Sequence, residues 1–189
     1  MAFMRGLAVV VAVTAMIGIS LAPHASAGEV TTTAVNGTFR DLGFLTGFEG
    51  ASPSPPAVPS EGVFRGTSEV DGRTMHGTVS YTLWGSPNSE GYFDFHSVEV
   101  FTGFVAECGR GTMTYTVVGT AKPYGLSDPT HSHLHATWLV VADSGTNGLA
   151  GVVSGGGELD GKTGPSVNSP DPTTNSGTIT GAVHCEQRR

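Results

Sequence analysis

The feature that most constrains the fold is a strict alternation of apolar side chains with threonines. In residues 111–118, apolar groups stand at every second position, and threonines stand between them: the apolar members are Met113, Tyr115 and Val117. Residues 78–84 repeat the pattern. Successive side chains of a strand point to opposite faces, so each stretch predicts a strand with one buried face. No stretch of ten residues has apolar positions at helical spacing, and the chain is predicted to be all-β.

About eight candidate strands follow from the same reasoning. They cover residues 30–40, 61–70, 74–84, 91–105, 111–121, 131–142, 147–159 and 174–185. Most connections are short and rich in turn residues, such as Asp71-Gly72, which favours sequential antiparallel pairing. These strands, without crossover helices, predict an antiparallel barrel, with a β-sandwich as the alternative. A barrel is preferred because it leaves no unpaired edge strand.

One segment, residues 51–60, interrupts the strand pattern. It contains Pro53, Pro55, Pro56 and Pro59. Proline cannot donate a ladder hydrogen bond, so the segment is predicted to be a loop. It is interpreted either as a lid over the mouth of the barrel or as a surface excursion.

The first 27 residues have the pattern of a secretory signal peptide. A single early charge, Arg5, precedes an apolar run from Gly6 to Leu21, and small residues surround the end at Ala27. Cleavage there would leave residues 28–189 as one domain, with no second long apolar stretch to hold it in a membrane. We therefore expect a secreted protein, extracellular or periplasmic, with an uncleaved anchor as the alternative.

The charge balance argues against one class of partner. The chain has 9 lysines and arginines against 16 aspartates and glutamates, a net charge of −7, and loss of Arg5 with the signal peptide makes it −8. Binding to a phosphate backbone requires a basic face, and here the basic residues are scattered. Nucleic acid is not expected as a partner.

The two cysteines, Cys108 and Cys185, are predicted to form a disulfide. Export takes the chain to an oxidising compartment, and no third cysteine is left over. Cys185 shares a strand face with Ile179 and Val183, which predicts that it points inward. The bridge would tie the last strand to the turn before the strand near Thr112. Two free thiols or a metal pair are the alternatives.

The run Ser144–Gly151, after Trp138 and a valine pair, resembles a motif of a bacterial family of uncharacterised domains in the allene oxide cyclase barrel superfamily. The spacing of further segments agrees with that family: they are residues 37–39, 77–81, 101–105 and 155–159. The cysteines and the proline loop depart from it. The resemblance implies an antiparallel barrel with an apolar interior, in which relatives hold a reactive small molecule. Activity does not transfer with a fold.

Three histidines, His131, His133 and His135, alternate on one strand face. Imidazole is a common ligand of zinc and copper. The outer two lie about 14 Å apart along a strand, so only adjacent members, His131 and His133, are candidate ligands for one ion. A third ligand would come from elsewhere, with three candidates: His96, His184 and Asp128. A solvent-facing strand start is the alternative. We expect weak or no zinc, and no cofactor is predicted.

One carboxylate, Glu99, lies on the same strand face as Phe93, Phe95 and Phe101, whereas Asp94 lies on the opposite face. Apolar surroundings would raise the pKa of Glu99 and suit it to acid or base chemistry in a cyclase. The alternative is a rim position in water. No nucleophile elbow, phosphate loop or dinucleotide fingerprint occurs, so no catalytic residue is assigned.

These observations predict a non-enzymatic barrel that binds an apolar small molecule or has a structural role outside the cell. The alternative is a cyclase or isomerase that shapes a small hydrophobic substrate in the barrel cavity.

Overall fold

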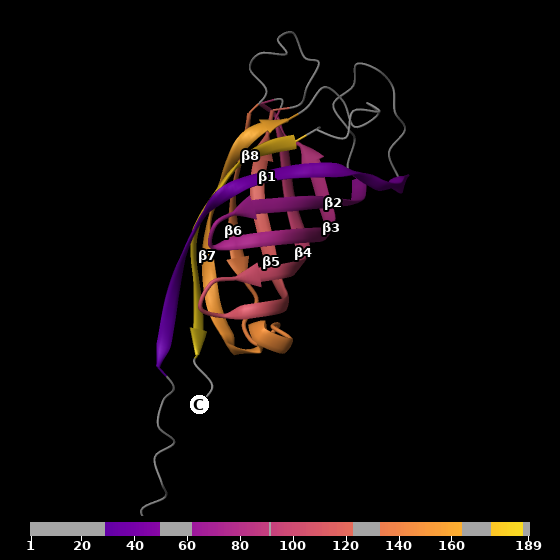
Figure 1. The fold of residues 1–189 in the computed structure, drawn as a ribbon. Coiled ribbons are helices and arrows are strands. Elements are labelled where there is room, and N and C mark those ends of the chain that lie inside the picture. The colour runs from indigo at the N-terminus through magenta and orange to yellow at the C-terminus, as the bar shows by residue number, and fades with distance from the viewer. Residues whose placement is uncertain (1–28, 50–61, 91, 123–132, 164–174, 187–189) are drawn as a thin grey trace, which may run out of the picture.

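The computed structural model describes residues 29–49, 62–90, 92–122, 133–163 and 175–186. These residues form an all-β fold in which eight antiparallel strands pair in sequence order and β8 returns to β1, closing a barrel (Figure 1). The strands are β1 (Val30–Glu49), β2 (Gly62–Gly72), β3 (Met75–Pro87), β4 (Phe93–Val105), β5 (Gly109–Ala121), β6 (Leu134–Val140), β7 (Val152–Thr163) and β8 (Asn175–Glu186). The predicted barrel is confirmed, and the sandwich alternative is wrong.

The buried apolar side chains lie inside the barrel, as the alternating pattern requires. On β5, Met113, Tyr115 and Val117 are buried and the threonines between them are less buried. On β6, the Trp138 ring is 1 % exposed, and its indole N–H donates to the Thr180 carbonyl oxygen at 3.0 Å. Partners of this kind let a large aromatic side chain bury both its ring and its polar atom.

The segment between β6 and β7 closes one end of the barrel (Figure 1). The Ser144 hydroxyl oxygen accepts from the Thr114 backbone N–H at 3.0 Å, which ties the segment to β5. The 3-10 turn η2 (Asn147–Gly151) then returns Leu149 to the core, where it is fully buried. At Gly148, a Cβ atom would lie 2.7 Å from the backbone nitrogen of Arg110, so only glycine allows this approach. The strand predicted over residues 147–159 therefore begins later, at Val152, because the 3-10 turn occupies its first five residues.

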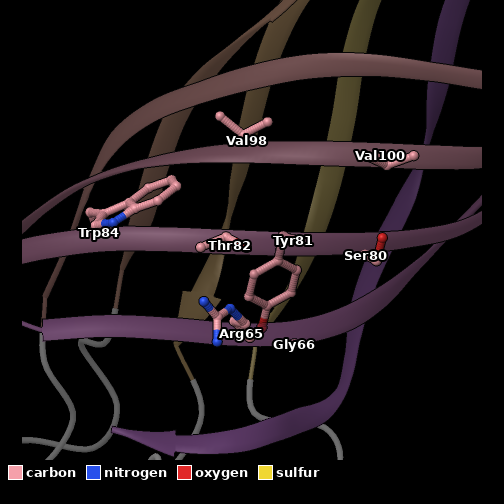
Figure 2. Close-up of a pocket in the computed structure, with 8 residues that line it drawn as sticks. All are labelled: Arg65, Gly66, Ser80, Tyr81, Thr82, Trp84, Val98 and Val100. Carbon is pink, nitrogen blue, oxygen red and sulfur yellow. The ribbon is translucent and has the colours of Figure 1, made fainter. Parts of the chain in front are cut away.

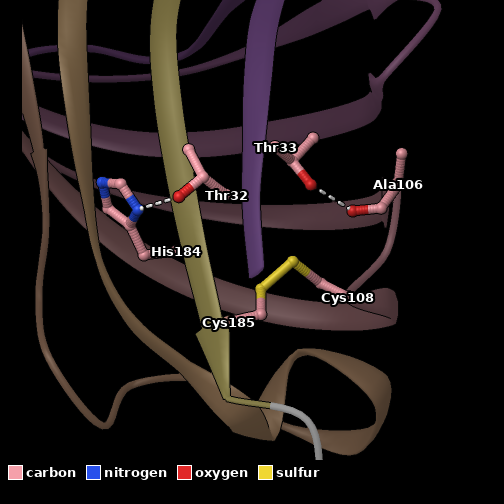
Figure 3. The surroundings of a disulfide bond; sticks show 6 residues. All are labelled: Thr32, Thr33, Ala106, Cys108, His184 and Cys185. Atoms are coloured by element: carbon pink, nitrogen blue, oxygen red, sulfur yellow. Dashed lines mark hydrogen bonds between the residues drawn. A yellow bond between two sulfur atoms is a disulfide. The ribbon is translucent and has the colours of Figure 1, made fainter. Parts of the chain in front are cut away.

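A disulfide joins the same end of the barrel to β8. Cys108, in the turn between β4 and β5, is bonded to Cys185, and their Cα atoms are 5.8 Å apart (Figure 3). Cys185 is 2 % exposed, as its inward-facing position predicts. Beside the bridge, the Thr33 hydroxyl donates to the Ala106 carbonyl oxygen at 2.7 Å, so β1 also holds the turn. The predicted bridge is present in the structure.

Two predicted segments lie outside the described residues: the signal peptide, 1–27, and the proline loop, 51–60. Within the part of the chain that is described, no helix has the length and hydropathy needed to span a membrane.

Candidate functional site

Polar side chains gather on the inner face of the barrel, whose lining is otherwise mainly apolar and aromatic. We call these residues the interior polar cluster: they are Asp41, Ser68, Tyr81, Ser97, Glu99, Tyr115 and Asn175. They come from β1, β2, β3, β4, β5 and β8. Buried polar groups of this number in one place require hydrogen-bond partners, and most of the cluster's contacts are internal.

A row of three side chains forms the centre of the cluster. Tyr81 on β3 stands opposite Glu99 on β4, and Glu99 stands opposite Tyr115 on β5. Neighbours in register on one face are close enough to interact. The Ser97 hydroxyl, two residues earlier on the same face, donates to Glu99 Oε1 at 2.7 Å. Glu99 therefore has hydroxyl groups on several sides.

Gly66 on β2 allows Tyr81 to reach across the barrel wall toward β1. Gly66 is the register partner of Tyr81, and a Cβ atom on it would meet the Tyr81 hydroxyl oxygen. The ring thus occupies the space a side chain would take, as Figure 2 shows. From there the hydroxyl donates to Asp41 Oδ2 at 3.3 Å, and the Asn175 amide nitrogen donates to the same oxygen at 2.5 Å.

Both carboxyl groups have raised pKa values. Burial raises the pKa of Glu99 to about 7, against hydrogen bonds from Ser97 and Tyr115 that lower it, and the charge of Asp41 adds to the increase. Burial likewise raises the pKa of Asp41 to about 6, opposed by its hydrogen bonds from Asn175 and Tyr81. Both carboxyl groups therefore titrate close to neutral pH.

The two tyrosines remain protonated donors. Burial raises the pKa of Tyr81 and of Tyr115, and the nearby carboxylates raise both further. A cluster with two titrating carboxyls and two fixed hydroxyl donors can orient a polar group of a ligand and can also transfer a proton to or from it.

A second feature lies on the outer surface of β2, β3 and β4. It is an open depression of about 440 Å³ (Figure 2), lined by Arg65, Gly66, Ser80, Tyr81, Thr82, Trp84, Val98 and Val100. Beside it, the Trp84 ring stacks on His96, with centroids 5.3 Å apart. Val98 in its lining and Glu99 in the interior point to opposite faces of β4, whereas Tyr81 borders both the depression and the interior polar cluster beside Gly66.

The structure describes only part of the predicted metal site. His131 and Asp128 lie outside the described residues. His133 and His135 point outward on either side of Asp160, with Nδ1 to carboxylate oxygen distances of 3.8 and 4.0 Å. Of the suggested third ligands, His96 stacks on Trp84 and His184 pairs with the Thr32 hydroxyl. Among described residues, no group of three or more ligating side chains forms.

Zinc binding stays a prediction from the sequence. We expect weak or no zinc in the dialysed protein, because His133 and His135 are exposed side chains without a preformed third ligand in the described residues. Elemental analysis after dialysis measures this. Stoichiometric zinc that is lost in the double variant His131→Ala/His133→Ala would contradict it.

Sequence reasoning identified Glu99 and missed most of its surroundings. The alternating pattern correctly places Glu99 on the inner face, where the residue is partly buried and burial raises the pKa of its carboxyl. Asp41 lies two residues after the buried Phe39 on β1, so the same alternation could have placed it inside. Asn175 carries no such signal, since it opens a strand.

Replacing Gly66 with alanine is expected to destabilise the protein by about 1 to 3 kcal/mol. The new methyl group overlaps the Tyr81 ring, and displacing the ring breaks its hydrogen bond to Asp41. Urea unfolding of Gly66→Ala, Tyr81→Leu and the double variant measures the coupling between the two sites. If Gly66→Ala destabilises the Tyr81→Leu background as much as the wild type, the overlap is not the cause.

Comparison of the chain with models of protein families, with curated proteins and with solved structures finds no match. The barrel is established by its own strand pairing. The resemblance of the Ser144–Gly151 run to the allene oxide cyclase superfamily stays a prediction.

Proposed function

We propose that this protein is an exported barrel that binds an apolar small molecule in its interior and holds a polar group of that molecule at the interior polar cluster. One observation carries the proposal. Glu99 points inward, yet it keeps accessible surface, whereas Ser97 and Phe101 on either side of it are 1 % and 0 % exposed. A few polar groups that converge within an apolar lining are typical of small-molecule sites.

The energetics of the cluster support a ligand-binding role over a purely structural one. A structural barrel of this size gains most from apolar side chains that fill its interior. Burying Asp41 and Glu99 instead destabilises their charged forms, as their raised pKa values show. Groups that reduce stability in this way are concentrated at functional sites.

Uptake of the neutral fluorescent dye N-phenyl-1-naphthylamine tests the proposal. Ser97→Leu places a larger side chain beside Glu99 and is expected to weaken dye binding about tenfold or more. The matched control is Val98→Thr, on the outer face of the same strand and in the lining of the outer depression. It is expected to change binding less than about twofold.

The milder variant Ser97→Val, together with circular dichroism of all the variants, separates a blocked site from a misfolded protein. Absence of dye binding to the wild-type protein would contradict the proposal. Loss of binding in Val98→Thr with no change in Ser97→Leu would place the dye in the outer depression instead.

A second candidate is an isomerase or cyclase in which Glu99 is the acid or base. The observation that favours it is the pKa of about 7 beside two tyrosine hydroxyl donors, a combination suited to proton transfer near neutral pH. Mass spectrometry of the lipophile that co-purifies with the natively exported protein would identify a test molecule. Incorporation of deuterium from heavy water into that molecule, abolished by Glu99→Gln, would support the enzyme.

Two features of the chain support the family and the cellular location that we propose for it. The turn at Ser144–Gly151, at the end of a closed eight-stranded barrel, supports membership of the allene oxide cyclase-like superfamily. The bond between Cys108 and Cys185 supports an oxidising compartment.

We expect the exported protein to begin at Gly28, within one residue, because signal peptidases cut after small-x-small patterns such as residues 25–27. N-terminal sequencing or intact mass of protein from the medium or periplasm measures this. Exported protein that retains Met1 would contradict the signal peptide.

A further inference from the structure

We infer that the molecule bound inside the barrel is a cation: a protonated amine carried on an apolar body. The inference rests on the proposed function and names the chemical class of its ligand. It follows from the sign of the charges in the interior polar cluster, from a buried hydroxyl that has no partner among the described residues, and from the aromatic rings beside the carboxyls.

Among the described residues, the charged side chains of the interior polar cluster are both carboxylates, Asp41 and Glu99. The Tyr81 hydroxyl donates to Asp41 Oδ2, and Tyr81 stands opposite Glu99 in register, so both carboxyls lie beside the same tyrosine. The charge of Asp41 accordingly raises the pKa of Glu99. Among the described residues, no lysine, arginine or histidine contributes to the shift of either carboxyl; the contributions are burial, hydrogen bonds and the repulsion between the two. The nearest cationic side chain along β1, Arg40, instead pairs with Glu69 on the outer face. A positive ligand group would relieve that repulsion.

Ser68 provides the second observation. It lies on the inner face of β2, directly opposite Asp41 in register, and is 7 % exposed. Its hydroxyl forms no hydrogen bond to any residue in the described parts of the chain, unlike that of Ser97, which donates to Glu99. A buried hydroxyl without a partner is rare in native proteins and calls for an explanation. A ligand group beside Asp41 would supply the missing partner.

The donor and acceptor count selects an ammonium group. An ammonium has three N–H donors and no acceptor. The Ser68 oxygen and the carboxylates of Asp41 and Glu99 are acceptors, so together they match it. A ligand carboxylate would add a third negative charge to the site, and a neutral alcohol would leave the charges of Asp41 and Glu99 uncompensated.

Aromatic rings near the carboxyls suit the same ligand. Tyr81 and Tyr115 flank Glu99 in register, and the Trp138 ring meets Tyr115 edge-on, with centroids 5.9 Å apart. Ring faces attract cations, most strongly where water is excluded.

Binding of three probes of the same shape tests the inference by isothermal titration calorimetry. The probes are phenethylammonium, neutral 2-phenylethanol and anionic 3-phenylpropanoate. At pH 8, we expect phenethylammonium to bind about tenfold or more tightly than 2-phenylethanol, and 3-phenylpropanoate to bind most weakly. Uptake of N-phenyl-1-naphthylamine is measured in parallel as the readout of the proposed function.

Variants of the cluster locate the bound cation. Glu99→Gln and Asp41→Asn are each expected to weaken phenethylammonium binding about tenfold, while 2-phenylethanol binding changes less than about threefold. Ser68→Ala, which removes one neutral acceptor, is expected to weaken phenethylammonium binding about threefold. The matched control is Glu69→Gln, a carboxylate on the outer face beside Ser68, which is expected to leave all three probes unaffected.

The outcomes separate the two proposals. Dye uptake with equal or tighter binding of 2-phenylethanol or 3-phenylpropanoate would overturn the cation and leave the proposed function intact. Phenethylammonium binding that is unchanged in both Glu99→Gln and Asp41→Asn would also overturn it, because the ion would then lie elsewhere. Absence of binding for the dye and for all probes would overturn both.

Discussion

Reduction of the bond between Cys108 and Cys185 is expected to lower the melting temperature by about 5 to 15 °C while the β-sheet circular dichroism persists. The bridge spans 77 residues of chain, and a cross-link over a loop of that length restricts the unfolded state strongly. It fixes β8 to the turn after β4, so its loss releases one end of the barrel. The β1–β8 ladder runs from Val30 to Arg40 on the β1 side and keeps the barrel closed.

Thermal unfolding with and without reductant measures this change. The double variant Cys108→Ala/Cys185→Ala is the control, since its melting temperature is expected to be low and insensitive to reductant. Free thiols in the denatured, unreduced exported protein would contradict the bridge. An unchanged melting temperature after complete reduction would contradict its role in stability.

The wild-type protein is expected to lose stability as the pH rises from about 4.5 to about 7. Glu99→Gln is expected to remove much of that loss. Burial raises the pKa of Glu99 from 4.5 to about 7 in the folded protein. Between these values the folded state binds a proton that the unfolded state has released, so the free energy of unfolding falls with increasing pH. The pKa shift of Glu99 corresponds to a loss of about 3 kcal/mol in the free energy of unfolding. This loss is complete near pH 7 and constant at higher pH.

Asp41 contributes with the same sign over a lower range, because its pKa is raised from 3.8 to about 6. Asp41→Asn should therefore flatten the lower part of the profile, and Glu99→Gln the upper part. The variant Glu99→Gln is expected to match the wild type in stability near pH 4.5 and to exceed it by up to about 3 kcal/mol at pH 8.

Urea unfolding at several pH values measures these profiles. Glu69→Gln is the matched control, because Glu69 is a partly exposed carboxylate paired with Arg40 on the outside of the barrel. Profiles of the wild type and Glu99→Gln that run parallel from pH 4.5 to 8 would show that the Glu99 carboxyl has an ordinary pKa. The cluster would then offer no acid or base near neutral pH.

The strands and the disulfide follow from the sequence alone. Alternation with period two predicts both where β5 runs and that Met113, Tyr115 and Val117 face inward, because backbone geometry forces successive side chains to opposite faces. The same rule places Glu99 inside on β4 and Cys185 inside on β8. Turn residues fix the order of pairing, since short connections leave consecutive strands adjacent.

The predicted strand ends differ from the observed ones where partners set the length. β1 runs to Glu49, nine residues beyond its predicted end, because it still pairs with β2 after its ladder with β8 ends at Arg40. β6 begins at Leu134 in the described structure, after the first two histidines of the predicted strand. Pairing partners are a property of the whole sheet, and local alternation does not contain them.

Only the tertiary structure decided which inward-facing groups meet. Closure of the barrel brings β8 beside β1, so that Asn175 reaches Asp41 across 134 residues of sequence. The absence of a side chain at Gly66 lets Tyr81 extend to the same carboxyl. A period-two pattern assigns each residue to a face of its own strand. It does not state which residues of other strands share that space, and the pKa of a carboxyl depends on those neighbours.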